Sequence, residues 1–195
     1  MAGMYEFDLA ILKWANDWVF WRAWADPLIV FRVEFLPWWM VAGLLAFGLA
    51  TLPPLSVVFP SFRHCRRRNW QVVIAALVAG VIARFGVVEL IRAFYNRPRP
   101  FEVLPDLHQL LTHSPGGSFP SGHAAFSFAI AAVVGRYYPK TSILFYGAAF
   151  SLSFSRVVVG IHWPSDIVGG AVIGIAVGLL THAIAKKFLK PKTAA

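Results

Sequence analysis

Five long apolar segments, separated by short polar breaks, constrain this chain more than any other feature. They cover residues 28–52, 70–91, 120–135, 141–159 and 164–185. A helix needs ~20 apolar residues to cross the hydrocarbon core of a bilayer, and these segments reach or approach that length. Only 14% of all residues are charged, whereas roughly 25% is usual in soluble domains. The sequence therefore predicts an all-α fold: a polytopic integral membrane helical bundle with five to six transmembrane helices.

The N-terminal residues 5–25 differ from these segments because tryptophans alternate with charged and polar side chains there. Tryptophan prefers the headgroup region of a membrane, which favours a helix lying in the interface, with a sixth span as the alternative. We expect residues 1–195 to form a single membrane-embedded domain. In it, residues 1–25 would form the interfacial helix and residues 26–195 the helical bundle.

Basic residues gather in three clusters beside the apolar segments, and the net charge is +9. The clusters contain Arg63, Arg66, Arg67 and Arg68; Arg136 and Lys140; and Lys186, Lys187, Lys190 and Lys192. This is the positive-inside pattern of a multi-pass protein of the plasma (inner) membrane and not a nucleic-acid patch. Counting the segments places all three clusters on one membrane face. The polar motifs then lie on the opposite face, which is periplasmic or extracellular if the basic face is cytoplasmic.

Nine polar residues converge on that opposite face according to the same count. They are Arg92, Arg97, Arg99, Ser121, Gly122, His123, Arg156, His162 and Asp166. Guanidinium groups repel one another unless an anion joins them, and their planar donors suit phosphate oxygens. The start of a helix at Ser121 and Gly122 would add backbone N–H groups and a favourable dipole. These residues predict a phosphate site.

Two histidines in this set can perform the chemistry of phosphate transfer. One imidazole can attack phosphorus and the other can donate a proton to the leaving oxygen. Asp166 follows His162 by four residues and can fix its tautomer, so His162 fits the nucleophile and His123 the acid. A metal site is not expected, because arginines surround the single useful carboxylate and repel cations. No cofactor is predicted either.

At these residues the chain resembles the type-2 phosphatidic acid phosphatase superfamily. The family signature has three parts: a Lys followed after six residues by Arg-Pro; Pro-Ser-Gly-His; and Ser-Arg, five residues, His, three residues, Asp. The matching residues are Arg92 with Arg99 and Pro100; Pro120 to His123; and Ser155, Arg156, His162 and Asp166. Arg92 stands where the family has Lys, which keeps the charge and changes its reach.

The resemblance implies a metal-independent phosphohydrolase with defined roles for the matching residues. His162 would be the nucleophile, Asp166 its orienting partner and His123 the general acid. The phosphate would be bound by Arg92, Arg99, Arg156, Ser121 and Gly122. Arg97 lies outside the signature, and it either adds to the anion site or contacts lipid headgroups.

The substrate is expected to be a lipid phosphate, because the site lies at the membrane–water boundary of a chain with little soluble mass. The overall organisation is similar to bacterial undecaprenyl-diphosphate phosphatases of this superfamily, which serve cell-wall carrier-lipid recycling and peptidoglycan synthesis. Phosphatidylglycerophosphate, phosphatidate and lipid A phosphatases share the same motifs, so they remain alternatives. A lipid phosphotransferase would form a phosphohistidine by the same attack of a histidine on phosphorus. A non-enzymatic lipid transporter or scaffold would leave the two histidines unexplained. Membrane lipids and the substrate are the partners expected, and the sequence predicts no oligomeric state.

Other residues of the apolar segments are expected to serve packing. A repeated small-residue spacing, which lets a second helix approach closely, is formed by Gly170, Gly174 and Gly178. For Arg84 and Glu89 we favour an ion pair or interhelical hydrogen bonds over catalysis. His113, in the loop before the Pro-Ser-Gly-His motif, is expected to face solvent.

Overall fold

The computed structural model describes residues 2–50 and 66–188, and every regular element in these two ranges is helical. The helices are α1 (Ala2–Asn16), α2 (Ala25–Glu34), α3 (Leu36–Leu49), α5 (Arg66–Val81), the π-helix η2 (Ile82–Val87), α6 (Val88–Phe94), α7 (Pro100–Val103), α8 (Gly122–Tyr137), α9 (Pro139–Val158) and α10 (Pro164–Phe188). The predicted all-helical fold is confirmed.

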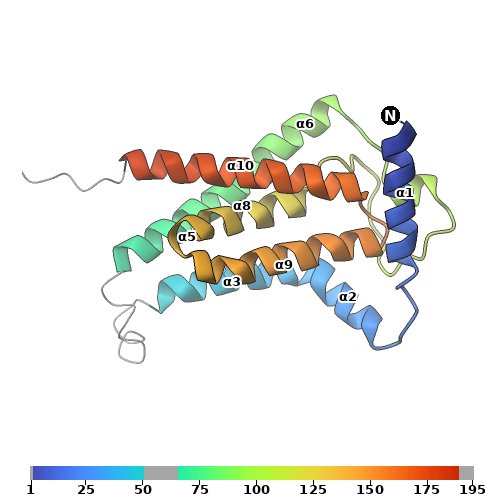
Figure 1. Cartoon of the computed structure of the whole chain (residues 1–195), viewed down its shortest axis with the longest axis horizontal. Coiled ribbons are helices and arrows are strands. Elements are labelled where there is room, and N and C mark those ends of the chain that lie inside the picture. The colour runs from blue at the N-terminus through green and yellow to red at the C-terminus, as the bar shows by residue number, and fades with distance from the viewer. Residues whose placement is uncertain (1, 51–65, 189–195) are drawn as a thin grey trace, which may run out of the picture.

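The long helices run side by side along the longest axis of the molecule, whereas α1 lies across one end of them (Figure 1). Among the described helices, three are long and apolar enough to cross a membrane: Arg67–Phe94, Pro139–Val158 and Pro164–Lys187. The pair α2 and α3 passes the same test as one bent span. The chain is therefore a multi-pass membrane protein, and α1, with 15 residues, is not among its candidate spans.

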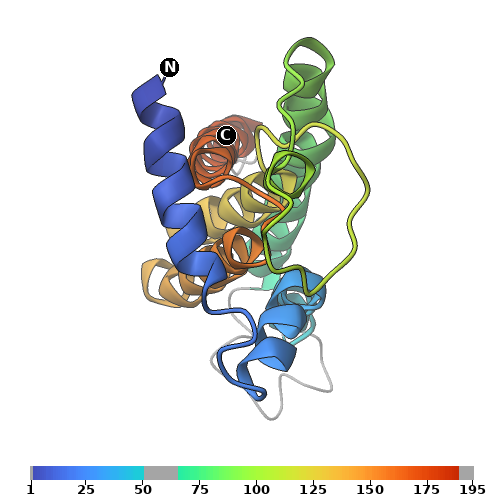
Figure 2. The same cartoon turned by 90° about the vertical axis from the view of Figure 1, so that its right-hand side faces the viewer.

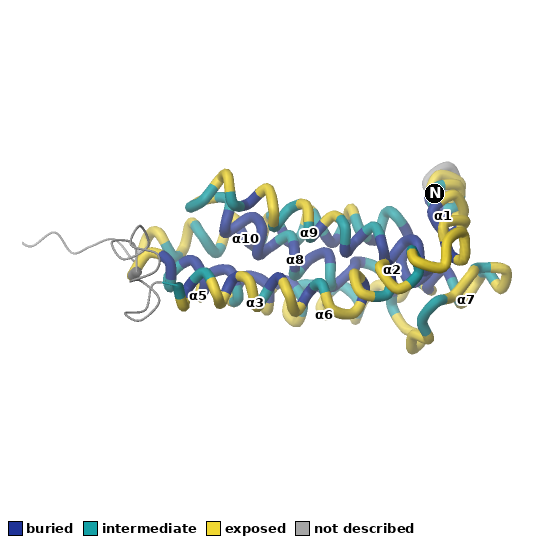
Figure 3. Tube along the Cα trace, turned by 90° about the horizontal axis from the view of Figure 1, so that it is seen from below, coloured by how far each residue is buried: buried dark blue, intermediate teal, exposed yellow. Residues whose placement is uncertain are grey.

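The central helix of the bundle is α8, which packs against α5, α9 and α10. It has only 16 residues, of which ten are buried, and buried residues gather along the middle of the bundle (Figure 3). Small side chains such as Ala125 and Ala129, both fully buried, allow neighbouring helices to lie close to it. Because other helices surround α8, it can be shorter than the ~20 residues that a lipid-facing helix needs to cross the bilayer.

The glycine stripe of α10 makes the closest of these contacts. A Cβ atom added to Gly170, Gly174 or Gly178 would collide with the backbone carbonyl oxygen of Ser121, Ala125 or Ala129, respectively. Only hydrogen fits at these three positions, so the backbones of α8 and α10 are in direct contact. The predicted packing role of the stripe is confirmed.

The first apolar segment is broken, although the sequence suggested one continuous span over residues 28–52. Its two parts, α2 and α3, meet at 59°. Pro37 lies in the first turn of α3 and has no N–H, so the carbonyl of Val33 four residues earlier lacks its intrahelical donor. The Nη1 atom of Arg156 donates to that carbonyl instead, at 3.4 Å. The break thus provides an acceptor for a side chain of the predicted phosphate site.

The two ends of the bundle carry the groups that the segment count predicted. The start of α5, the link between α8 and α9 and the end of α10 lie at one end, with the described members of the basic clusters. The end of α6, the start of α8, the end of α9 and the start of α10 lie at the other, beside α1 (Figure 2). Arg63, Lys190, Lys192 and the expected end of the first segment at Leu52 lie outside the described residues.

The N-terminal helix is held against the bundle by its buried face. Leu12 and Ala15 are fully buried, whereas Phe7 and Trp14 remain 64% and 55% exposed. The Asn16 side-chain amide donates to the carbonyls of Val158, at 2.8 Å, and His108, at 2.9 Å. An amphipathic helix that lies across the bundle end in this way is consistent with an interfacial position. The helix ends at Asn16, earlier than the predicted residue 25.

Candidate active site

The predicted site residues come from separate parts of the chain that meet at the α1 end of the bundle. Arg92 lies on α6, Arg99 precedes α7, and His123 lies in the first turn of α8. Arg156 is in the last turn of α9, and His162 lies between α9 and α10. These segments meet because consecutive antiparallel helices bring their alternate ends to the same side.

The turn that carries His162 depends on Gly160. This residue has φ +72°, a left-handed conformation that glycine adopts without strain and that often ends a helix. Its carbonyl accepts a hydrogen bond from the N–H of Phe101 at 3.2 Å, which ties the turn to α7. The backbone N–H of His162 donates to the carbonyl of Arg156 at 3.3 Å. The chain therefore returns His162 towards the end of α9, close to Arg156.

His162 and Asp166 are paired in the interior. Nδ1 of His162 lies 3.4 Å from Oδ2 of Asp166, and the two residues are 2% and 0% exposed. The same carboxylate oxygen accepts the backbone N–H of Trp163 at 2.8 Å, which holds it at the start of α10. A proton on Nδ1 would leave Nε2 of His162 with its lone pair available. The geometry matches the orienting pair expected from the spacing.

The surroundings of His162 keep its imidazole neutral. Burial is the main cause that lowers its pKa well below 6.5, and the positive charges of Arg156, Arg99 and Arg92 lower the pKa further. A neutral imidazole retains a nucleophilic nitrogen at neutral pH. The arginines that would hold a phosphate thus also favour the reactive form of the histidine beside it.

Arg92, Arg99 and Arg156 share one mode of attachment. Each donates from a guanidinium Nη atom to one backbone carbonyl: Arg92 to Pro120 at 2.9 Å, Arg99 to Ile161 at 3.0 Å and Arg156 to Val33 at 3.4 Å. The Nε atom of each arginine is buried and has no hydrogen-bond partner within the described residues, and the same holds for Oγ of Ser121. Unsatisfied buried donors are costly. Three cationic donors and one hydroxyl in this state can bind an anion.

Gly122, which the sequence assigned to the phosphate site, is the first residue of α8. A Cβ atom on Gly122 would collide with the Cδ, Nε and Cζ atoms of Arg84, so the Arg84 side chain lies directly against this backbone. Arg84 also forms the predicted ion pair, and its partner is Glu89. The sequence favoured an ion pair or interhelical hydrogen bonds over catalysis for Arg84, and the structure also brings this side chain to the first turn of α8.

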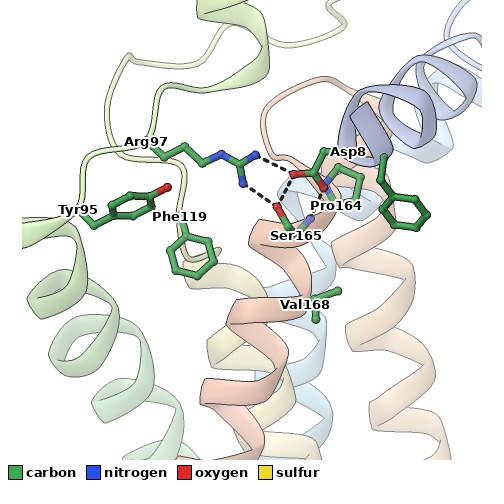
Figure 4. Close-up of a pocket in the computed structure, with 8 residues that line it drawn as sticks. Asp8, Tyr95, Arg97, Phe119, Pro164, Ser165 and Val168 are labelled. Carbon is green, nitrogen blue, oxygen red and sulfur yellow. Dashed lines mark hydrogen bonds and ion pairs between the residues drawn. The ribbon is translucent and has the colours of Figure 1, made fainter. Parts of the chain in front are cut away.

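Arg97 has a different environment from the other three arginines. Its guanidinium donates to Asp8 at 2.7 Å, to Asp166 at 2.9 Å and to the Ser165 hydroxyl at 2.6 Å. Figure 4 shows Arg97, Asp8 and Ser165 pointing towards one another at the junction of α1 and α10. Neither sequence alternative, anion binding or headgroup contact, describes this arrangement. Arg97 holds the second oxygen of the carboxylate that orients His162.

One residue of the candidate site was not found by sequence reasoning. Asp8 is 1% exposed and accepts hydrogen bonds from Arg97 and from the backbone N–H of Ser165. An acidic residue on the predicted interfacial helix was the only signal for Asp8. His113 is exposed, as expected from the sequence, and partial burial together with the charges of Arg99, Arg156 and Arg92 lowers its pKa to about 4.

Within residues 2–50 and 66–188, no group of three or more His, Cys, Asp or Glu residues could hold a metal ion. The described site consists of the imidazole rings of His123 and His162, guanidinium groups and the start of a helix. These groups can bind a phosphate and exchange a proton with it.

The amino-acid sequence of this chain is similar to those of known proteins. The bacitracin transport permease protein BcrC of Bacillus licheniformis is 25% identical over 182 residues, which cover 93% of this chain and 82% of that protein. The undecaprenyl-diphosphatase BcrC of Bacillus subtilis (strain 168) is 36% identical over 108 residues, which cover 53% of this chain and 54% of that protein. The alignment therefore spans about half of that relative.

A solved structure has the same fold. The crystal structure of the first transmembrane PAP2 type phosphatidylglycerolphosphate phosphatase from Bacillus subtilis superposes with a TM-score of 0.59 at 21% identity, covering 98% of this chain and 90% of that one. Residues 69–190, which contain all three motifs, match the PAP2 superfamily. The chain belongs to the PAP2 superfamily.

Proposed function

We propose that this membrane protein is a lipid phosphatase that removes the terminal phosphate of undecaprenyl diphosphate, leaving undecaprenyl phosphate and inorganic phosphate. The observation that carries the proposal is the buried, Asp166-paired His162 beside three arginines whose Nε donors have no partner among the described residues. The similarity to the undecaprenyl-diphosphatase BcrC supports this choice of lipid. We further propose that the whole chain acts as one catalytic domain with its site on the outer membrane face.

In the proposed first step, Nε2 of His162 attacks the terminal phosphorus. A nitrogen–phosphorus bond forms and the bond from phosphorus to the bridging oxygen breaks, while His123 gives its proton to the leaving oxygen. Arg92, Arg99 and Arg156 would hold the three equatorial oxygens of the transferring group, and the start of α8 would add backbone donors. The products are the lipid monophosphate and a phosphohistidine.

In the second step, water replaces the histidine. His123 removes a proton from the water as the new oxygen–phosphorus bond forms, and the nitrogen–phosphorus bond breaks. Inorganic phosphate leaves and His162 is again neutral. Throughout both steps Asp166, held by Arg97 and by the N–H of Trp163, would keep the proton of His162 on Nδ1.

The test is phosphate release by the purified protein from a panel of lipid phosphates. It includes undecaprenyl diphosphate, phosphatidylglycerophosphate, phosphatidate and lipid A, because the motifs allow each of them. We expect the highest kcat/KM with undecaprenyl diphosphate and loss of turnover in His162→Ala. The matched control is His108→Ala, since His108 lies outside the arginine cluster and contacts the Phe20 ring. Full phosphate release by His162→Ala would refute the nucleophile.

Three further measurements test the alternatives to this proposal. Excess chelator should leave the activity intact, because no step uses a metal ion. Release of free phosphate in the absence of an acceptor lipid distinguishes hydrolysis from phosphotransfer. A transporter would release no phosphate from any substrate of the panel; the Bacillus licheniformis relative is named as a transport permease protein for bacitracin.

A further inference from the structure

A pocket of about 310 Å³ lies beside the candidate active site, between α3, η2 and α8. Its lining includes the apolar side chains of Pro37, Trp38, Phe85 and Phe126. The only ionisable residues that line it, within the described chain, are Arg84 and His123. The pocket therefore joins apolar walls to the proposed general acid.

The pocket lies at the surface of the bundle. Trp38 and Phe85, from opposite walls, are 73% and 65% exposed, and both lie on helices proposed to cross the membrane. Side chains with this exposure on a membrane-spanning helix face lipid. An apolar chain can therefore enter this pocket from the bilayer without crossing water.

Arg84 stands where this pocket meets the site. Its side chain lies against Gly122, its guanidinium carbon is 5.1 Å from the centre of the Phe85 ring, and Glu89 pairs with its Nη1 atom. Its positive charge acts on His123, Arg92 and Arg156. It lies on the π-helix η2, and π-helical turns often re-aim a side chain at a functional site.

The chemistry of the proposed first step indicates what should lie next to Arg84. His123 protonates the bridging oxygen, and in a lipid diphosphate that oxygen belongs to the lipid-attached phosphate. This second phosphate must lie beside His123, on the side away from His162, since attack and departure are in line. Arg84 is the cation that lines the same pocket as His123.

A second pocket, of about 660 Å³, is lined by Arg97, Tyr95 and Val168 among others and is drawn in Figure 4. Its arginine donates to three side chains, Asp8, Ser165 and Asp166, whereas, within the described residues, the ion pair of Arg84 is with Glu89 alone and involves its Nη1 atom. The pocket at Arg97 is therefore less suited to an additional phosphate than the one at Arg84.

We propose that Arg84 binds the lipid-attached phosphate of a lipid diphosphate whose apolar chain occupies the pocket between Trp38 and Phe85. This inference rests on the proposed function and adds a specificity determinant to it. Arg84 would favour diphosphates over monophosphates of the same lipid, because a monophosphate has no group to place there.

The test compares farnesyl diphosphate with farnesyl monophosphate, which share one apolar chain, in detergent micelles. We expect Arg84→Gln to lower kcat/KM for the diphosphate by about 10-fold or more, since a charge-assisted hydrogen bond is lost. For the monophosphate we expect a change of less than about 3-fold, and Arg84→Lys should restore part of the diphosphate rate. The matched control is Arg32→Gln, because Arg32 is an exposed arginine on α2. It should change neither rate.

A second pair of variants tests the chain pocket independently of Arg84. Trp38→Ala should raise the KM for farnesyl diphosphate by about 3-fold or more, because apolar contact is lost. Trp39→Ala, whose side chain is 61% exposed and lines a different pocket, should not. Equal losses on both farnesyl substrates in Arg84→Gln, or equal effects of the two tryptophan variants, would overturn the inference. Release from neither farnesyl substrate by a protein that hydrolyses undecaprenyl diphosphate would overturn the inference alone, whereas release from none of the three would overturn the proposed function.

Discussion

Asp8 of α1 forms an ion pair of 2.7 Å with Arg97, which lies 89 residues later in the chain. Arg97 in turn donates to Asp166 at 2.9 Å, so the N-terminal helix is joined through one guanidinium to the carboxylate that orients His162. Asp8 is 1% exposed, and its other carboxylate oxygen accepts the N–H of Ser165. α1 is therefore part of the support of the candidate site.

Removal of the Asp8 charge should impair the reaction without removing a group that touches the substrate. Breaking one partner of a buried ion pair costs about 3 kcal/mol or more, and Arg97 would be free to shift away from Asp166. We expect Asp8→Asn to lower kcat by about 10-fold or more, with a smaller change in KM. Asp17→Asn, at an exposed position one residue after α1, is the control. Equal kcat values in the two variants would contradict the positioning role.

The proposed acid role of His123 predicts a dependence on the leaving group. General acid catalysis contributes about 10²- to 10⁴-fold, and it matters most when the leaving oxygen is strongly basic. A lipid monophosphate expels an alcohol, whereas a lipid diphosphate expels a much less basic phosphate. We therefore expect His123→Gln to reduce kcat for farnesyl monophosphate more than for farnesyl diphosphate. Equal reductions would show that His123 does not protonate the leaving group.

The titration of His113 should report whether an anion occupies the arginine cluster. Its pKa is about 4, lowered by burial and by the charges of Arg99, Arg156 and Arg92. A bound anion offsets those charges, so the pKa of His113 should rise when vanadate is added. Nuclear magnetic resonance of ring-labelled histidine measures the change, with His182 near the opposite end of α10 as the reference. A His113 pKa that vanadate leaves unchanged would argue against an anion at these arginines.

The contact between α8 and α10 predicts a stability difference between two glycine substitutions. A Cβ at Gly174 would collide with the carbonyl of Ala125, whereas a Cβ at Gly147 of α9 meets no atom within 4 Å. We expect Gly174→Ala to lower the free energy of unfolding by about 1–3 kcal/mol. Gly147→Ala should have no destabilising effect, because alanine is the better helix former. Thermal unfolding in detergent compares the two, and similar midpoints would refute the close approach.

The helices and the identity of the convergent residues could be predicted because both depend on local patterns. Apolar length predicts a span, and counting spans places His123 and His162 at the same end. The break at Pro37 could have been anticipated from its missing N–H, yet its use by Arg156 could not. Such a contact joins residues 123 positions apart and depends on how α2 and α9 pack.

The positions of Asp8 and Arg84 beside the candidate site could not be predicted for the same reason, because their contacts depend on how separate helices pack. Asp8 was predicted to be one of several charges on an interfacial helix, and Arg84 to be half of an ion pair. The pair with Glu89 is present, but its position against Gly122 depends on the approach of η2 to α8. Periodicity along one segment describes which face is apolar. It contains no information about which distant residue that face will meet.

The hydrogen bond between Asp8 and Ser165 can form only late in the synthesis of this chain. The two residues lie 157 positions apart, so Asp8 leaves the ribosome well before its partner, which is made only after α9 is complete. Until then the Asp8 carboxylate can bond with Arg97 but not with Ser165, and α1 can dock on α9 through Asn16 but not on α10. A nascent chain halted before α10 would therefore contain His162 but lack Asp166, the carboxylate that pairs with it. The pairs of His162 with Asp166 and of Ser165 with Asp8 can therefore form only after the start of α10 has been made.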